Sequence, residues 1–240
     1  MAELQSAEKQ RYVADLFSRI SGRYDLMNDL MTLGMHRRWK RRAAALAAHD
    51  LNGPAIDISS GTGDLAIALA KRPGIKHTVG LDLLREMVVR ADAKILSRRL
   101  SSSITMMSGD SLSLPFSNDS FVCATAGFSL RNMPDVEKAL SEMVRVVRPG
   151  GRVAILELAP MNPGVQSTLF RPIFHCLVPL IGRLVAGDRS AYSYLPRSVD
   201  YFLAADQLAS MLTGLGLEDV NYRRLGFGTV ALHWGVKKAY

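Results

Sequence analysis

The sequence has little cysteine and no long uninterrupted apolar run. Its 240 residues include two cysteines, Cys123 and Cys176, and both have apolar neighbours. Two such thiols do not form a disulfide framework, so a reducing cytosol is the expected compartment. The first ten residues are polar and lack the apolar core of a secretory signal. The nearest approach to a membrane span, residues 173–185, is short and interrupted by a histidine, a proline and an arginine, so we do not expect it to cross a bilayer.

Acidic residues are also in deficit. The chain has 30 lysines and arginines against 22 aspartates and glutamates, which gives a formal net charge of +8. Such an excess suits nucleic acid, anionic lipid or an anionic ligand, and it equally suits a solvated surface that keeps a protein soluble. The densest basic run, residues 37–42, lies in an expected amphipathic helix and so forms one positive face. We do not expect nucleic acid as a partner, whereas peripheral contact with a membrane surface stays open.

Hydrophobic periodicity divides the chain into a helical beginning and an alternating core. Residues 7–48 place apolar side chains at helical spacing, with breaks at Ser21-Gly22 and Gly34. From Pro54 onward, short apolar runs alternate with helical segments. The expected strands are 55–58, 77–81, 104–107, 121–126 and 152–158, and the expected helices between them are 65–71, 86–99 and 136–147. This order predicts a parallel sheet with helices on both faces.

The last third of the chain is less regular. Residues 161–195 are apolar and interrupted by prolines, and we interpret them as an insertion that caps a site. A helix at 205–215 and two paired strands at 219–225 and 229–236 complete the pattern. We therefore expect one domain over 1–240, with a helical N-terminal lid (1–50), a cofactor-binding core (51–160), a substrate cap (161–204) and a C-terminal helix with strands (205–240).

A glycine loop carries the first sign of chemistry. Residues 57–64, with the sequence DISSGTGD, lie between an expected strand and an expected helix. Gly61 and Gly63 allow a sharp turn and a close approach to a ligand, and the following helix offers N–H groups to a carboxylate or phosphate. Asp57 can accept a hydrogen bond from a ligand ammonium. Asp82 ends the next strand, where an acidic side chain receives the hydroxyls of a ribose.

These features predict an adenosine-type ligand without choosing its kind. The loop also satisfies the loose glycine pattern of dinucleotide sites, so NAD and S-adenosylmethionine both stay open at this point. Asp110 and Ser111 end the third strand, near the same crevice. An acidic side chain there can take an adenine amino group or simply begin a turn, and the sequence does not separate these two roles.

The second half favours a methyltransferase. Leu130-Arg131-Asn132 follow the fourth strand, and residues 144–153 form a helix that enters a Pro-Gly-Gly turn and a strand, a pattern typical of Rossmann-like methyltransferases. The most specific stretches are YDLMNDLM at 24–31, HRRWK at 36–40 and RVVRPGGRV at 145–153, followed by Leu156-Glu157. On these motifs the chain resembles the ubiquinone/menaquinone biosynthesis C-methyltransferases, the UbiE/MenG group, over nearly its whole length.

The resemblance implies S-adenosylmethionine as cofactor and a Rossmann-like class I methyltransferase fold. That fold has a mostly parallel seven-stranded sheet with an antiparallel C-terminal strand. The family's cofactor contacts fall on Thr62, Asp82, Asp110 and Ser111, to which the loop adds Asp57, Gly61 and Gly63; a serine of the family is Gly127 here.

The implied acceptor is a prenylated quinol, with demethylmenaquinol favoured over a benzoquinol. The alternatives are a methyltransferase on another small aromatic or lipid, a non-catalytic scaffold and an NAD-dependent oxidoreductase. The apolar stretch 170–185 would hold the prenyl tail.

Ring methylation needs an electron-rich carbon, which a quinol supplies once a ring hydroxyl loses its proton. The catalytic candidates are Arg131 and Asn132 after the fourth strand, and Tyr24 and His36 in the N-terminal lid. Arg131 stays protonated, so it is suited to stabilise a phenolate or orient a water rather than to act as the base. His36 has a better intrinsic pKa for a base, but it can equally be a capping histidine. No metal site is expected, and a homodimer stays open.

Overall fold

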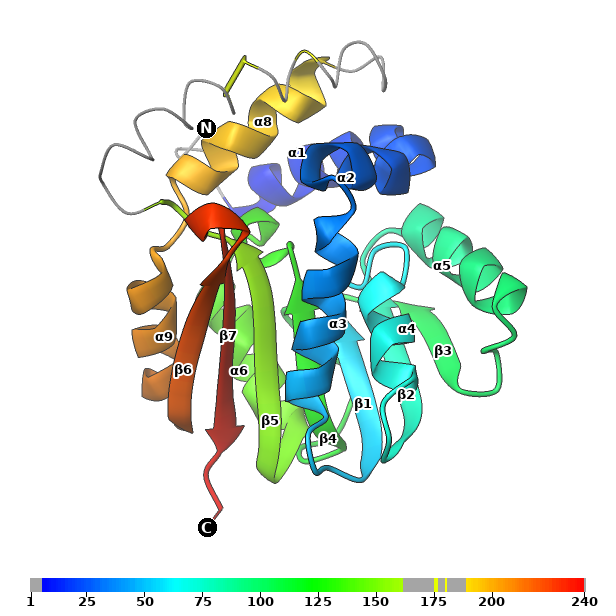
Figure 1. Ribbon diagram of the computed structural model, residues 1–240, viewed down its shortest axis with the longest axis vertical. Helices are drawn as coiled ribbons and strands as arrows, with labels where there is room; N and C mark the ends of the chain where they lie inside the picture. Colours follow the sequence, from blue (N-terminus) through cyan, green and yellow to red (C-terminus); the bar gives the residue numbers. More distant parts are fainter. Residues whose placement is uncertain (1–5, 162–174, 177–179, 181–188, 240) are drawn as a thin grey trace.

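A seven-stranded sheet forms the centre of the molecule (Figure 1). The computed structural model describes residues 6–161, 175–176, 180 and 189–239. The strand order is β3-β2-β1-β4-β5-β7-β6, and β7 alone among the described strands runs antiparallel to its neighbours. The strands are β1 (Gly53–Ile58), β2 (Ile75–Asp82), β3 (Ile104–Ser108), β4 (Phe121–Gly127), β5 (Val147–Leu158), β6 (Leu217–Leu225) and β7 (Val230–Lys237). The predicted mostly parallel sheet is confirmed.

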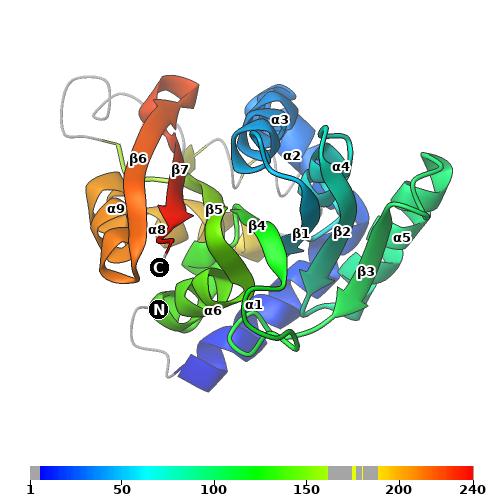
Figure 2. The ribbon, with the colours of Figure 1, turned by 90° about the horizontal axis from the view of Figure 1, so that it is seen from below.

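Helices cover both faces of the sheet, as Figure 2 shows from below. On one face, α3 (Met35–Ala47) and α4 (Asp64–Ala70) pack a cluster of alanines, leucines and Trp39 against β1, β4 and β5. On the other face lie α6 (Val136–Val146) and α9 (Ala205–Gly214). At the β3 edge, α5 (Arg85–Ser97) packs with α4 over β3. The centres of β1 and β4, at the middle of the sheet, are buried on both faces.

One boundary differs from its prediction. The Pro149-Gly150-Gly151 segment, expected as a turn before a strand at Arg152, lies inside β5, which begins at Val147. Phe121 pairs with Val147 and Cys123 with Arg152, so β5 bulges against β4 between these pairs. Gly150 adopts a φ of +73°, and a Cβ on Gly151 would lie 2.6 Å from the Val122 carbonyl oxygen. The two glycines therefore allow a bulge where the sequence suggests a chain reversal.

The N-terminal helices lie across the carboxyl ends of the parallel strands (Figure 1). They are α1 (Ser6–Ile20), the short η1 (Ser21–Arg23) and α2 (Tyr24–Thr32), and the chain then enters α3. The breaks at Ser21-Gly22 and Gly34 stand where the sequence placed them. Beside them lies α8 (Arg189–Asp200), from the expected cap, whereas most of 170–185 falls outside the described residues. In the described part of the chain, no helix is long and apolar enough to cross a membrane.

Candidate functional site

A small cavity of about 120 Å³, with several polar side chains among its walls, lies above the carboxyl ends of the parallel strands. The glycine loop, the ends of β2 and β3 and the segment after β4 form its floor, and α1 covers it. Its walls are formed by Gln10, Val13, Ala14, Phe17, Tyr24, Ser59, Gly61, Asp82, Leu83, Leu84, Met87, Asp110, Ser111, Gly127, Phe128, Ser129, Asn132, Met133 and Pro134. The structure thus brings together Gly61, Asp82, Asp110 and Ser111, four of the residues that were predicted to bind the cofactor.

Asp82 ties the glycine loop to the start of α5. Its Oδ2 accepts a hydrogen bond from the Gly61 amide at 2.8 Å, and its Oδ1 accepts one from the Leu84 amide at 2.9 Å. Burial raises the pKa of this carboxyl, while the two amides act in the opposite direction. Because each carboxylate oxygen can accept more than one hydrogen bond, Asp82 keeps acceptor capacity toward the cavity.

Asp110 begins a turn, one of its two predicted roles, while its contact with an adenine amino group stays a prediction. Its Oδ1 accepts a hydrogen bond from the Leu112 amide at 2.9 Å, which closes a turn, and the residue also lines the cavity. Arg145 of α6 holds the following loop by donating to the carbonyl oxygens of Leu114 (3.0 Å) and Phe116 (2.7 Å). Arg145 belongs to the RVVRPGG motif, so this family signature has a positioning function for the cavity wall.

Asn132 offers an acceptor without a partner. Its Oδ1 is buried and has no hydrogen-bond partner within the part of the chain that the structure describes. The residue follows β4 in the short η2 (Leu130–Asn132) and lines the small cavity. A buried, unsatisfied acceptor is costly, so a ligand that donates a hydrogen bond suits this position. Asn132 was predicted as a catalytic residue. In the structure it lies on the wall of the small cavity, with the predicted cofactor-binding residues.

Asp57, for which a contact with a ligand ammonium was predicted, does not line the small cavity. It is almost completely buried under the loop, and its two oxygens accept hydrogen bonds from Thr125 Oγ1 at 2.7 Å and Ser60 Oγ at 2.6 Å. Burial raises its pKa to about 6. The expected direct contact with a ligand ammonium is therefore not supported by this geometry. Asp57 instead holds β1, β4 and the glycine loop together.

Thr62 and Gly63, in the same loop, do not line the small cavity either. Gly63 has a φ of +81°, and a Cβ there would lie 3.1 Å from the Ala91 Cβ, so its lack of a side chain lets α5 pack closely. Thr62 Oγ1 donates to Asp25 Oδ1 of α2 at 2.6 Å and accepts from Lys94 Nζ at 2.9 Å. Lys94 Nζ also lies 2.6 Å from Asp25 Oδ2.

A second carboxylate extends this polar cluster. Asp64 receives Lys40 Nζ at 3.1 Å and Lys94 Nζ at 3.0 Å. Burial alone would raise the pKa of Asp64, but the two ammonium groups hold it below its ordinary value. Asp25, Lys94 and Lys40 were not expected at the site. We call the contact of Asp25 with Thr62 and Lys94 the Asp25 latch, because it fastens α2 to the glycine loop.

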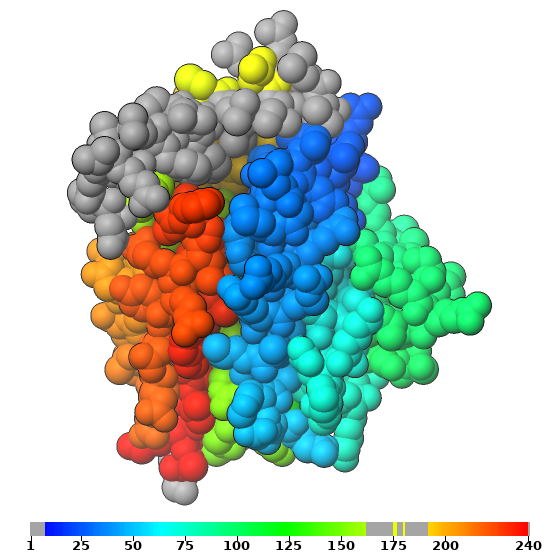
Figure 3. All heavy atoms as spheres, in the orientation of Figure 1, coloured from blue at the N-terminus to red at the C-terminus, as the bar shows by residue number. Residues whose placement is uncertain are grey.

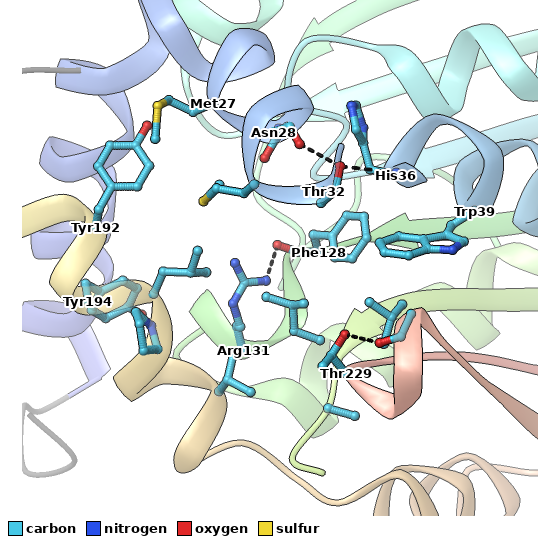
Figure 4. A pocket seen from close by; sticks show the side chains of 18 of the residues that line it. Met27, Asn28, Thr32, His36, Trp39, Phe128, Arg131, Tyr192, Tyr194 and Thr229 are labelled. Atoms are coloured by element: carbon cyan, nitrogen blue, oxygen red, sulfur yellow. Dashed lines mark hydrogen bonds between the residues drawn. The ribbon is translucent and has the colours of Figure 1, made fainter. Parts of the chain in front are cut away.

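A large apolar cavity of about 670 Å³ adjoins the small one. Tyr24, Phe17 and Phe128 line both, so the two spaces meet there. Figure 4 shows the larger space between α2, α3, α8 and the end of β5. Its other walls are formed by Leu16, Ile20, Met27, Asn28, Met31, Thr32, Met35, His36, Trp39, Arg131, Leu158, Ala159, Pro160, Met161, His175, Tyr192, Tyr194, Leu195, Pro196, Val199, Asp200, Gly226, Phe227, Thr229 and Val230.

Arg131 is the charged group at the floor of this cavity. Its Nη1 lies 2.6 Å from Glu157 Oε1 and 2.5 Å from the Phe128 carbonyl oxygen (Figure 4 shows the latter). Glu157 also receives the Leu158 amide at 2.8 Å, and both charged side chains are buried. The sequence singled out Arg131, whereas Glu157 was seen as part of a motif without a role.

His36 and Tyr24 occupy different positions. Tyr24 stands between the two cavities. His36 is buried at the corner between α2 and α3, where its Nε2 lies 2.9 Å from Asp29 Oδ1 and its ring points away from Arg131 (Figure 4). Burial lowers the pKa of His36, although the hydrogen bond to Asp29 opposes the shift. This geometry favours the alternative reading of His36, a histidine that fixes the helix corner.

Comparison with known proteins covers almost the whole chain. The profile of the ubiE/COQ5 methyltransferase family matches residues 4–237. A demethylmenaquinone methyltransferase of Roseiflexus castenholzii is 41% identical over 232 residues, 96% of this chain and 95% of the relative. A ubiquinone/menaquinone biosynthesis C-methyltransferase UbiE of Rickettsia prowazekii is 36% identical over 234 residues, 96% of this chain and 94% of the relative.

Among solved structures, the fold is shared with more distant proteins. A SAM-dependent methyltransferase of Thermotoga maritima, described as a possible histamine N-methyltransferase, superposes with a TM-score of 0.66 at 16% identity. The match covers 94% of this chain and all of the other. At this identity the likeness concerns the fold, and it confirms the predicted class I methyltransferase architecture.

Proposed function

Because the chain belongs to the ubiE/COQ5 methyltransferase family, we propose that it methylates a ring carbon of a prenylated quinol with S-adenosylmethionine as donor, the acceptor being demethylmenaquinol. The observation that carries the proposal is the pair of adjoining cavities. A small space into which the strand-end carboxylates Asp82 and Asp110 open meets a large apolar one at Tyr24, which suits a cofactor with a ribose and an adenine facing an apolar acceptor.

The polar residues of the small cavity fit such a cofactor. Asp82 is placed to receive the ribose hydroxyls, and Asp110 the adenine amino group. Asn132 Oδ1, which lacks a partner among the described residues, offers a further acceptor. Gly61, with a φ of +56°, brings the backbone to the cavity without a Cβ. The cofactor, when bound, supplies an electrophilic methyl group on a sulfonium.

The space itself is too small in this conformation. About 120 Å³ lies well below the roughly 300 Å³ at which ligand pockets begin, because side chains of α1 fill it from above. Phe17 and Val13 are among these side chains. For the cofactor to enter, α1 and α2 would have to move, and the N-terminal helices would then act as a lid.

Arg131 is the group best placed to act on the acceptor. The ring hydroxyl must lose its proton to make the carbon nucleophilic, and the oxygen then carries negative charge. A buried guanidinium stabilises that charge more strongly than the same group would in water. Its bond to Glu157 fixes its position, and the apolar walls around it exclude water.

A direct assay tests the proposal. The purified protein is incubated with S-adenosylmethionine carrying a labelled methyl group and with a reduced short-chain demethylmenaquinol or its benzoquinol counterpart. We expect label in the ring of the naphthoquinol product by mass spectrometry, and loss of transfer in Asp82→Ala. The Rickettsia relative, named for both quinones, makes benzoquinol methylation the second candidate function, and label in that acceptor alone would select it. A thermal shift with NAD but none with S-adenosylmethionine would contradict the proposal.

A further inference from the structure

Helix α2 and the residue that ends it present three leucines to the outside. Leu26 and Leu30 are four residues apart and so lie on one side of the helix, and Leu33 is the left-handed residue at which the helix ends. Their exposed fractions are 51%, 43% and 86%. We call these three residues the outer face of α2. Single exposed leucines are common on proteins, but three on one short helix and its end form a patch that calls for a partner.

The polar side chains of the same helix turn inward. Asp25 is held in the latch with Thr62 and Lys94. Asp29 pairs with His36 and Arg37 at the corner with α3, and Asn28 lines the large cavity. The apolar stripe that packs α2 on the rest of the chain is formed by Tyr24, Met27 and Met31, on a different side of the helix from the three leucines. The outer face of α2 is therefore not required by the fold of this chain.

A second apolar tip lies near the same cavity. Phe227, in the short η4 (Gly226–Gly228) between β6 and β7, is 78% exposed and also lines the large cavity. Figure 3 shows α2 and α3, in blue, beside these C-terminal strands, in red. Met35, which follows Leu33 at the start of α3, lines the cavity as well. The outer face of α2 is thus continuous with the walls of the apolar cavity.

Positive charge adjoins this face. Arg37, Arg38 and Arg41 are exposed on the first turns of α3, and the whole chain carries a formal net charge of +8. Apolar side chains flanked by arginines are the combination that binds an anionic bilayer surface. A symmetric dimer through the same face would instead set the arginines of the two copies near each other.

We propose that the outer face of α2 docks on the surface of a bilayer rich in anionic phospholipid, with the arginines of α3 at the headgroups. This inference rests on the proposed function in one respect: docking there brings the apolar cavity to the membrane in which a prenylated quinol is dissolved. The tail of the acceptor then passes from lipid to protein without crossing water, a transfer that the hydrophobic effect favours.

Vesicle co-sedimentation of the full chain tests the docking. Wild type is mixed with vesicles of phosphatidylglycerol and phosphatidylcholine, or of phosphatidylcholine alone. We expect the double variant Leu30→Glu/Leu33→Glu to partition about tenfold or more weakly, since two apolar side chains no longer enter the interface. Leu96→Glu is the matched control, because Leu96 is 69% exposed on α5, away from this face, and it should bind as wild type does.

Charge variants separate the two parts of the interaction. The double variant Arg38→Glu/Arg41→Glu should weaken binding to the anionic vesicles and have little effect on the weak binding to neutral vesicles. Arg98→Glu, at an exposed position just after α5, is the control and should bind anionic vesicles as wild type does. Equal binding of wild type and the double leucine variant would overturn the proposal. The proposal would also be overturned if neither protein bound vesicles and the wild type were a dimer while the leucine variant was a monomer, because the face would then be a dimer interface.

Methylation of a short-chain quinol in solution distinguishes this proposal from the proposed function. Leu30 and Leu33 line neither cavity, so their double variant should keep the wild-type rate on the soluble acceptor and lose rate on long-chain quinol in vesicles. A wild type that binds anionic vesicles through this face but transfers no methyl group would contradict the proposed function and support the docking face.

Discussion

Arg131 and Glu157 form an ion pair of 2.6 Å that is buried where the segment after β4 meets the end of β5. Arg131 lines the large apolar cavity, whereas Glu157 does not. Two charges in such a place are expensive to desolvate, and the pair adds little stability compared with apolar residues of similar size. The buried Arg131–Glu157 pair is therefore better explained by an action of the Arg131 charge on a ligand than by a contribution to folding.

Substitution of this pair separates stability from activity. Glu157→Leu should lower the free energy of unfolding by about 3 kcal/mol, because Arg131 is left buried without its partner. The double variant Arg131→Leu/Glu157→Leu should recover most of that loss and still transfer no methyl group. Urea denaturation and the labelled-methyl assay measure the two effects. A double variant that methylates at a near-normal rate would exclude the role given to Arg131.

Arg145 should control cofactor affinity from a distance. It donates to the carbonyl oxygens of Leu114 and Phe116 and thereby fixes the loop that carries Asp110. We expect Arg145→Ala to weaken binding of S-adenosylmethionine about tenfold by titration calorimetry, because loss of a charged hydrogen-bond donor is worth about 1.5 kcal/mol or more. Arg148, three residues later in the same motif, is exposed, and Arg148→Ala should bind as wild type does. Equal affinities of the two variants would contradict the loop-positioning role.

The order of helices and strands could be predicted because it depends on local patterns. Apolar runs and helical spacing indicated β1 to β4 within one or two residues at most boundaries. The start of β5 could not be predicted, since Pro149-Gly150-Gly151 is a turn signal in any local reading and the bulge depends on contact with β4. In this region tertiary pairing decided the conformation.

The site was predictable to the extent that it follows strand ends. Asp82 and Asp110 stand at the cavity because parallel strands end at one edge of the sheet. Asp57 lies near the end of β1 as well, but its side chain turns under the loop toward Thr125. The sequence pattern alone could not predict that this side chain points away from the cavity. The Asp25 latch joins residues 37 positions apart. No local signal indicated that contact, nor the burial of Glu157 beside Arg131.

Asp57 should make stability depend on pH in an unusual direction. Its pKa is raised from 3.8 to about 6 by burial, so the folded state binds this proton more tightly than the unfolded state does. Its ionisation therefore opposes folding above pH 6, and this penalty disappears as the pH falls from about 6 to about 4. The effect is about 3 kcal/mol in size.

Asp57→Asn isolates this contribution. The amide keeps the shape and can still bond the hydroxyls of Ser60 and Thr125, but it carries no charge. We expect the variant to exceed wild type in free energy of unfolding at pH 7.5, and the difference to shrink steadily toward pH 4.5. Denaturant titrations across that range measure it. A difference that is constant with pH would mean that Asp57 titrates normally.

The Asp25 latch should set how readily the lid opens. Asp25 accepts from Thr62 Oγ1 at 2.6 Å and lies 2.6 Å from Lys94 Nζ, and these contacts hold α2 on the glycine loop. Since the small cavity holds about 120 Å³ while the lid is closed, the cofactor enters when the latch opens. Removing the carboxylate in Asp25→Ala should favour the open state by about 1.5 kcal/mol, which is about tenfold in its population.

Two measurements check the latch. Amide hydrogen exchange in α2 should become about tenfold faster in Asp25→Ala, and stopped-flow association of S-adenosylmethionine should accelerate in proportion. Asp92→Ala is the control, since Asp92 is exposed on α5 near Lys94 in sequence and takes no part in the latch. Faster exchange without faster association would show that α2 loosens but does not gate entry, and the movement that admits the cofactor would then belong to α1, whose side chains fill the cavity directly.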